Sequence, residues 1–158
     1  MSGSALYEVA GPASLIVAGC AELLKGAAGP LMVGRDRPRL AALAAAAAIV
    51  GHNWSPWINW KGGRGVSLVL GAGLVLAPEA TALVGAGLAF GRLLRKTGAG
   101  TFVALVLLPV VLASRRGSAG AWIASAFVIP VLAKRLVGNE NRLPAPAEAL
   151  RRLVLDRS

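Results

Sequence analysis

Long apolar runs separated by short basic segments dominate this sequence and restrict the folds open to it. Lys or Arg lies between successive runs, which cover about residues 12–33, 40–50, 66–90, 100–113 and 119–133. Only 15% of the residues are charged, whereas soluble domains have about 25% charged residues. The runs do not alternate polar and apolar residues, as strands of a membrane barrel do. We therefore predict an all-α fold, a polytopic membrane helix bundle.

The run 66–90 determines how many helices cross the membrane. It forms either one span or two short helices that break at Ala77–Ala80. Pro78 and Glu79 are both costly in the middle of a bilayer helix, which favours the break. The break gives about six short transmembrane helices and places both chain ends on one side, with most of the seventeen Lys and Arg residues. The positive-inside rule then places the ends, and the segment around Gly62, in the cytoplasm.

The formal net charge of +10 would indicate nucleic-acid binding in a soluble protein. Here the cations flank apolar runs, as they do next to anionic lipid, so we expect membrane lipids and not nucleic acid as partners. One histidine and one cysteine, Cys20, cannot build a zinc site or a disulfide. We expect no metal and no cofactor.

A glycine-rich basic segment, Lys61-Gly62-Gly63-Arg64-Gly65, lies between two apolar runs. Glycines allow backbone N–H groups to approach an anion closely, because no Cβ blocks them. Lys61 adds a point charge and Arg64 a planar fork, and both suit phosphate. The segment therefore predicts a phosphate-binding loop, and the alternative is a basic loop that contacts lipid head groups. Trp54, Trp57 and Trp60 precede it at every third position, which is typical of anchoring at a membrane interface.

Two further sets of residues are candidates for the same site. His52 titrates near neutral pH and could act as a base or a phosphate donor, although no carboxylate lies near it in the sequence to orient it, and a structural role is the alternative. Glu22 and Lys25 are three residues apart and share a helix face. Charges inside a membrane helix are functional or mutually paired, so Lys25 is either a second phosphate ligand or the partner of Glu22.

The segment from Gly51-His52 through Pro56 to Trp60-Lys61-Gly62-Gly63-Arg64-Gly65-Val66 resembles the second conserved region of a family of bacterial membrane acyltransferases (PlsY type). These enzymes transfer an acyl group from acyl phosphate to glycerol 3-phosphate. Their region ends in Lys-Gly-Gly-Lys-Gly-Val, so Arg64 replaces a lysine. The stretch Glu22-Leu23-Leu24-Lys25-Gly26 is similar to the family's Asp-Leu-Leu-Lys-Gly, and residues 135–140 resemble the end of its third region.

The sequence departs from the family pattern in two other regions. Residues 129–133 occupy the place of a histidine and an asparagine in the third region, and Glu8 stands where the family has an arginine. Residues 2–5 align with the family's Gly-Ala-Thr-Asn stretch, and we expect no counterpart of the helix that precedes it. These departures leave a second interpretation open: a family member without catalysis that binds anionic lipid or a partner protein.

The resemblance implies an enzyme that makes lysophosphatidic acid from acyl phosphate and glycerol 3-phosphate in phospholipid biosynthesis. It implies substrate phosphate binding by Lys61, Gly62, Gly63, Arg64, Gly65 and Lys25, with His52 as the candidate catalytic base. We expect a multi-pass protein of the bacterial plasma membrane whose glycine loop faces the cytoplasm. Residues 1–143 form the acyltransferase-like domain, and residues 144–158 form a basic tail. Residues 144–155 of this tail are either an amphipathic helix or a solvated segment.

Overall fold

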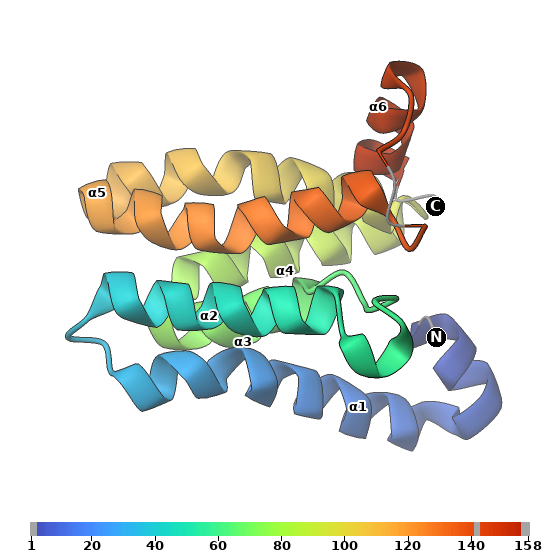
Figure 1. Ribbon diagram of the computed structural model, residues 1–158, viewed down its shortest axis with the longest axis horizontal. Coiled ribbons are helices and arrows are strands. Elements are labelled where there is room, and N and C mark those ends of the chain that lie inside the picture. Colours follow the sequence, from blue (N-terminus) through green and yellow to red (C-terminus); the bar gives the residue numbers. More distant parts are fainter. Residues whose placement is uncertain (1–2, 141–142, 156–158) are drawn as a thin grey trace.

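The computed structural model describes residues 3–140 and 143–155, and these residues form helices and turns without a strand (Figure 1). The all-α prediction is confirmed. One single-turn 3-10 helix, η1 (Pro56–Ile58), lies between the second and third helices. The α-helices are α1 (Gly3–Val33), α2 (Pro38–Asn53), α3 (Val66–Leu76), α4 (Pro78–Leu93), α5 (Thr97–Val137) and α6 (Pro146–Leu155).

Helix α5 folds back on itself at Gly117, which has φ 58° and ψ −138°. Only glycine adopts this backbone conformation without steric cost. The arms on either side, residues 97–116 and 118–137, lie next to each other in Figure 1, and Gly120 packs against the carbonyl of Leu112. The sequence predicted two runs here, 100–113 and 119–133, and the bend separates them. Helix α1 has a similar bend at Gly11 (φ 76°, ψ 178°).

The predicted break in the run 66–90 is confirmed, because α3 ends at Leu76 and α4 begins at Pro78. Proline suits the first position of a helix, where its missing N–H has no partner to lose. Arg116 stabilises the break from the bend of α5. Its Nη1 donates a 2.7 Å hydrogen bond to the Leu76 carbonyl at the end of α3, and its other nitrogens bind the Glu79 carboxylate.

Small residues bring the helices into close contact at two crossings. Where α1 crosses α3, a Cβ on Gly26 would lie 2.2 Å from the Leu68 carbonyl, so the two backbones touch. Glycines 87, 91 and 100 allow a similar approach between α4 and the first arm of α5. Such crossings are typical of helices that pack through small residues in a bilayer. Helix α3 lies inside the bundle, and its buried residues are Leu68, Val69, Gly71, Ala72, Gly73, Val75 and Leu76.

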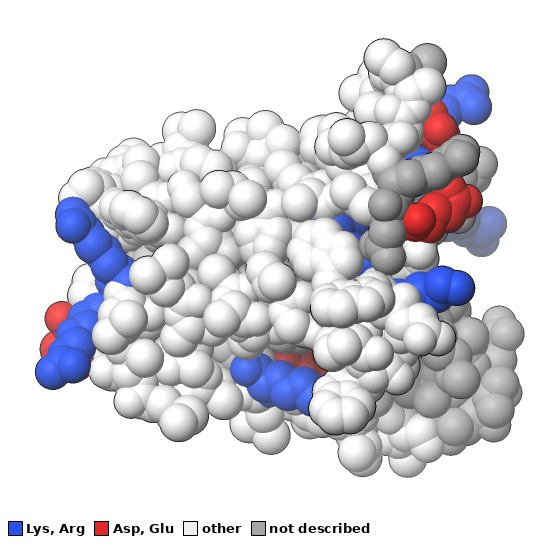
Figure 2. Space-filling view, viewed as in Figure 1, with Lys and Arg blue, Asp and Glu red and all other residues white. Residues whose placement is uncertain are grey.

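Most of the middle of the surface is apolar and the charges gather at its two ends, apart from one blue and red patch at mid-length near the lower edge (Figure 2). Large apolar side chains point outward from this middle region; Leu24 is 68% exposed, Val110 68% and Ile129 65%. The turn 34–37 and the bend of α5 lie at one end of the bundle, and the loop 54–65, the turn 94–96 and α6 lie at the other (Figure 1). In the described residues, the cations therefore lie at the two ends of the bundle, as predicted for a chain whose run 66–90 breaks at Pro78.

Two helical stretches, Gly11–Val33 and Thr97–Val137, are long and apolar enough to cross a membrane. The bend at Gly117 divides the second of these stretches into two arms. The remaining apolar helices are shorter: α2 and α4 have 16 residues each and α3 has 11. A perpendicular span needs about 20 residues, and a shorter helix is tolerated where protein surrounds it. Six transmembrane helices therefore stay a prediction.

Candidate functional site

The glycine segment lies in a loop, residues 54–65, that folds back onto the end of α2. The Gly62 N–H donates a 3.2 Å hydrogen bond to the Asn53 carbonyl, and the Trp60 N–H donates a 2.9 Å bond to the Ser55 carbonyl. Gly65 then takes a left-handed conformation (φ 71°) and begins α3 at Val66. The loop thus reaches the N-terminus of a helix, where free N–H groups and the helix dipole favour an anion.

Close packing explains why glycine occupies positions 62 and 63. A Cβ on Gly62 would lie 1.9 Å from the His52 carbonyl oxygen, and a Cβ on Gly63 would lie 2.2 Å from His52 Nε2. The sequence predicted that the glycines expose their amides to phosphate. Because the Gly62 amide already binds Asn53, this glycine serves the fit of the loop, and the amides of Gly63 and Gly65 remain the candidates for an anion.

His52 lies between the glycine loop and a carboxylate from α1. Its Nδ1 is 3.0 Å from Glu22 Oε2, while Nε2 faces Gly63. The buried Oε2 has this ion-pair contact but no well-aligned hydrogen bond. Glu22 also accepts a 3.0 Å bond from Lys25 Nζ through its other oxygen. Sequence reasoning paired Glu22 with Lys25 alone and found no carboxylate for His52, because Glu22 belongs to another helix.

Asn53 connects the loop to the second arm of α5. Its side chain is fully buried, and Nδ2 donates a 3.0 Å bond to the Pro130 carbonyl. Its Oδ1 has no hydrogen-bond partner and lies next to Gly65. Residues 129–133, which replace the expected histidine and asparagine, therefore lie next to the glycine loop.

Two buried cations at the end of α5 border the same loop. Lys134 is 2% exposed and Arg135 is 3% exposed. Lys134 Nζ donates to the Trp60 carbonyl at 3.2 Å and lies 5.2 Å from the centre of the Trp54 ring. Arg135 Nη1 donates to the carbonyls of Gly98 and Leu153, each at 3.0 Å.

Arg135 follows Lys134, which binds the Trp60 carbonyl in the loop that carries Arg64, so three cations gather at this end of α5. Burial lowers the pKa of Arg64, but a guanidinium remains charged at neutral pH. Sequence reasoning did not include Lys134 or Arg135 among the site residues. The signal was present, since both follow directly on an apolar run, and charges at such positions are functional or paired.

The predicted site residues therefore fall into two environments. Gly65 is buried and Arg64 and His52 are half-buried, whereas Gly63 and Lys61 are exposed. Lys25 is 62% exposed at the side chain and is bound to Glu22, so its predicted pairing is confirmed and a phosphate role stays a prediction. The side chain of Glu8 lies outside the described residues. Among the side chains described, no group of three His, Cys, Asp or Glu residues could hold a metal ion.

Comparisons with known proteins identify a family for this chain. The family model described as glycerol-3-phosphate acyltransferase matches residues 1–144. Glycerol-3-phosphate acyltransferase 2 of Deinococcus radiodurans is 30% identical over 153 residues, which are 88% of this chain and 78% of that protein. Glycerol-3-phosphate acyltransferase of Synechococcus sp. (strain CC9902) is 37% identical over 108 residues, which are 67% of this chain and 54% of that protein.

Other relatives match over shorter segments. Glycerol-3-phosphate acyltransferase 5 of Dehalococcoides mccartyi is 42% identical over 62 residues, or 39% of this chain and 26% of that protein. The chain thus spans between about a quarter and about half of the length of these last two curated relatives. No solved structure matches the chain. The family match covers the glycine loop, His52 and the cations at the end of α5, and the chain belongs to the glycerol-3-phosphate acyltransferase family.

Proposed function

We propose that the protein transfers the acyl group of acyl phosphate to the 1-hydroxyl of glycerol 3-phosphate. The reaction gives lysophosphatidic acid and inorganic phosphate for phospholipid biosynthesis. The observation that carries this proposal is the position of His52, which lies between the Glu22 carboxylate and the glycine loop. A base needs a ring that is fixed next to the substrate, and the Glu22 contact holds the His52 ring beside the loop, with 22% of its side chain exposed.

In the proposed reaction, the hydroxyl oxygen attacks the acyl carbonyl carbon, and His52 Nε2 accepts the hydroxyl proton. The bond between the carbonyl carbon and the phosphate oxygen then breaks, and inorganic phosphate leaves with the proton that His52 returns. The Glu22 carboxylate holds Nδ1 and stabilises the charged ring, as the third member of a catalytic triad does. Acyl phosphate is already activated, so positioning and charge neutralisation supply much of the remaining catalysis.

The glycine loop is the proposed phosphate site. Arg64, Lys61 and the amides of Gly63 and Gly65 lie at the N-terminus of α3, and the helix dipole adds to their attraction for an anion. Lys134 and Arg135 contribute positive charge from the buried end of α5 that borders the loop. Because these charges are removed from bulk water, each acts more strongly on a phosphate than it would at an open surface.

The apolar outer faces support a location in the bacterial plasma membrane, with the glycine loop in the cytoplasm. Trp57 and Trp60 are 92% and 55% exposed next to this loop, and Trp122 is 47% exposed five residues after the bend at Gly117. Tryptophan favours the head-group zone on both sides of a bilayer. Trp57 and Trp60 at one end and the single Trp122 near the other therefore suit the two interfaces, and acyl phosphate would enter from the lipid side.

The deciding experiment uses the purified chain in nanodiscs with labelled glycerol 3-phosphate. We expect labelled lysophosphatidic acid with acyl phosphate as the donor and none with acyl coenzyme A or acyl carrier protein. Arg64→Ala and Lys61→Ala should each reduce the rate at least about tenfold, which corresponds to about 1.4 kcal/mol of transition-state binding. Arg115→Ala, an exposed cation at the opposite end, is the matched control. No product from folded protein would refute the enzyme function.

The second candidate function is binding of anionic lipid without catalysis. Its specific support is that residues 129–133 replace the family's histidine and asparagine at a position that contacts Asn53. The same nanodiscs distinguish the two functions. A non-catalytic protein would retain anionic lipid through Arg64 and release no phosphate from acyl phosphate, whereas the enzyme releases phosphate in equal amount to its product.

A further inference from the structure

Helix α6 is an additional element that packs against the end of α5, beyond the residues 1–144 that match the family. One face of α6 is open, since Leu150 is 66% exposed and Arg151 is exposed. Arg152, the next residue, is only 4% exposed. A buried arginine next to an exposed one indicates that Arg152 has a defined set of partners inside the protein.

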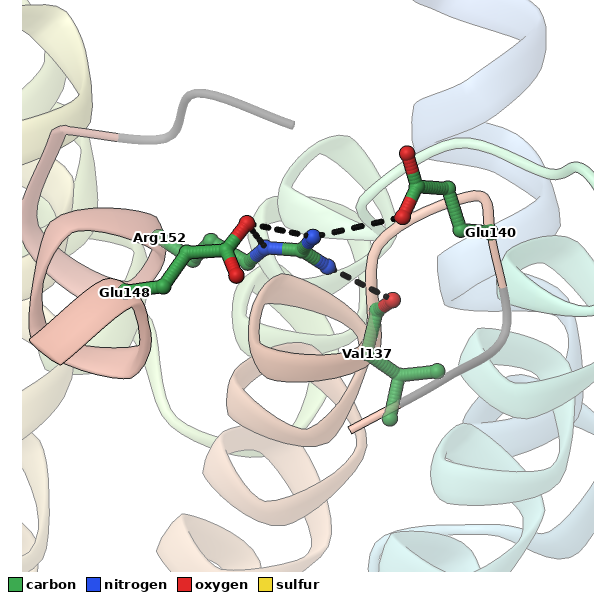
Figure 3. A network of polar contacts seen from close by, with 4 residues as sticks. All are labelled: Val137, Glu140, Glu148 and Arg152. Carbon is green, nitrogen blue, oxygen red and sulfur yellow. Dashed lines mark hydrogen bonds and ion pairs between the residues drawn. The ribbon is translucent and has the colours of Figure 1, made fainter. Parts of the chain in front are cut away.

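Arg152 joins α6 to the end of α5 (Figure 3). Its Nη1 donates a 3.1 Å bond to the Val137 carbonyl, and its Nη2 donates to Glu148 at 2.7 Å and to Glu140 at 3.4 Å. Val137 is the last residue of α5, so its carbonyl has no partner within the helix. A cation at this position both satisfies the carbonyl and interacts favourably with the helix dipole.

The same contact reaches the cations beside the glycine loop. Leu153 follows Arg152, and its carbonyl accepts a 3.0 Å bond from Arg135 Nη1. The same nitrogen donates to the Gly98 carbonyl at the start of α5. Arg135 is thus held between the start of α5 and α6, next to Lys134, which binds the Trp60 carbonyl in the loop that carries Arg64.

We propose that α6 is a latch that fixes Arg135 beside Arg64 for phosphate binding, and that Arg152 is the positioning residue of this latch. The proposal rests on the proposed function, because it assigns the phosphate of a substrate to these cations. Arg152 does not reach the phosphate itself. Loss of the Arg152 side chain would free α6 and remove the Leu153 carbonyl from Arg135. The Arg135 guanidinium would then be less restrained, and a less restrained cation binds phosphate more weakly.

Steady-state kinetics in nanodiscs test the latch. We expect Arg152→Ala to raise KM for a phosphate substrate about tenfold and to change kcat less than about twofold. This pattern is expected when the ground state and the transition state lose the same binding energy. Arg151→Ala is the matched control, since it removes the same charge from the exposed face of the same helix. Arg152→Lys should give an intermediate KM. Equal effects of Arg152→Ala and Arg151→Ala would overturn the proposal.

A double-mutant cycle tests whether Arg152 acts through Arg135. In an Arg135→Ala background, Arg152→Ala should raise KM much less than it does in the wild type. The reason is that Arg152 is proposed to act only through Arg135. If the factor persists, α6 does not act through Arg135 and the proposal is wrong. Glu148→Gln weakens the same latch at a partly exposed carboxylate and serves if Arg152→Ala does not fold.

A measurement without turnover separates failure of the latch from failure of the proposed function. Calorimetric titration with inorganic phosphate should show weaker binding to Arg152→Ala than to the wild type and to Arg151→Ala. Hydrogen exchange of the α6 amides should become faster in Arg152→Ala only. If the protein transfers no acyl group but Arg152→Ala still binds phosphate more weakly and exchanges its α6 amides faster, the enzyme function is refuted and the role of α6 is supported. Unchanged phosphate affinity with faster exchange would refute the latch.

Discussion

Glu22 Oε2 lies 3.0 Å from His52 Nδ1, although the two residues belong to different helices, α1 and α2. The opposite ring nitrogen faces Gly63. A histidine held in this way by a carboxylate has a defined orientation, and its free nitrogen points to the loop that we propose for phosphate. This pair is the arrangement in the described part of the chain that most resembles a catalytic base and its orienting group.

Replacement of His52 tests the base directly. We expect His52→Ala to lower kcat by about 10²–10⁴-fold, the usual contribution of a general base, and Glu22→Gln to lower it less, because the ring remains. Initial rates at saturating concentrations of both substrates measure the effect. Asp36→Asn removes an exposed carboxylate at the opposite end and should leave kcat unchanged. A kcat for His52→Ala within about twofold of the wild type would show that His52 is structural.

The close packing of Gly62 and Gly63 predicts how alanine at each position changes the stability of the protein. A Cβ at Gly62 would meet the backbone carbonyls of His52 and Asn53, whereas one at Gly63 would meet side-chain atoms of His52. We expect Gly62→Ala to destabilise the protein by about 1–3 kcal/mol, the usual cost of overpacking, and Gly63→Ala to cost less. Gly85→Ala in α4, with nothing within 4 Å of its Cβ, is the control. Thermal unfolding in detergent compares the three variants, and equal losses for both loop variants would contradict the packing argument.

The cations at the two ends of the bundle predict the topology in the membrane. In a Cys20→Ser background, Lys61→Cys should react with an impermeant maleimide only when the cytoplasmic face is accessible, and Arg115→Cys only from the other side. Sealed vesicles of both orientations provide the measurement, and membrane lysis provides the control for intrinsic reactivity. Reaction of both variants from one side would rule out the six-helix version.

Arg116 is expected to stabilise the break between α3 and α4. Its loss leaves the Leu76 carbonyl and the Glu79 carboxylate without their partner. We expect Arg116→Ala to lower the free energy of unfolding by about 1–2 kcal/mol, the lower part of the usual cost of an unpaired polar group. The lower part applies because the Arg116 side chain is 38% exposed and its ion pair is therefore screened by water. Arg115→Ala, its exposed neighbour, should have little effect. Thermal unfolding measures both, and acyl transfer by Arg116→Ala should equal that of the wild type.

Much of the local structure followed from the sequence. Apolar runs, Pro78 and Gly117 determine where helices form, break and bend, because those preferences depend on a residue and its immediate neighbours. The helix in the tail was one of two alternatives, and the structure shows it as α6. Its apolar and charged positions permit a helix, but only the tertiary structure shows that Arg152 attaches this helix to the end of α5.

The sequence alone determined the helical class, favoured the break at Pro78 and placed the glycine segment between two apolar runs. Only the tertiary structure joined Glu22 to His52, placed Lys134 and Arg135 beside Arg64, and brought Leu153 to Arg135. These partners lie far apart in the chain, so no local pattern links them. Their proximity results from the close crossing of α1 and α3 at Gly26 and Gly71, and from the bend at Gly117, which returns α5 to the end of the bundle where it began.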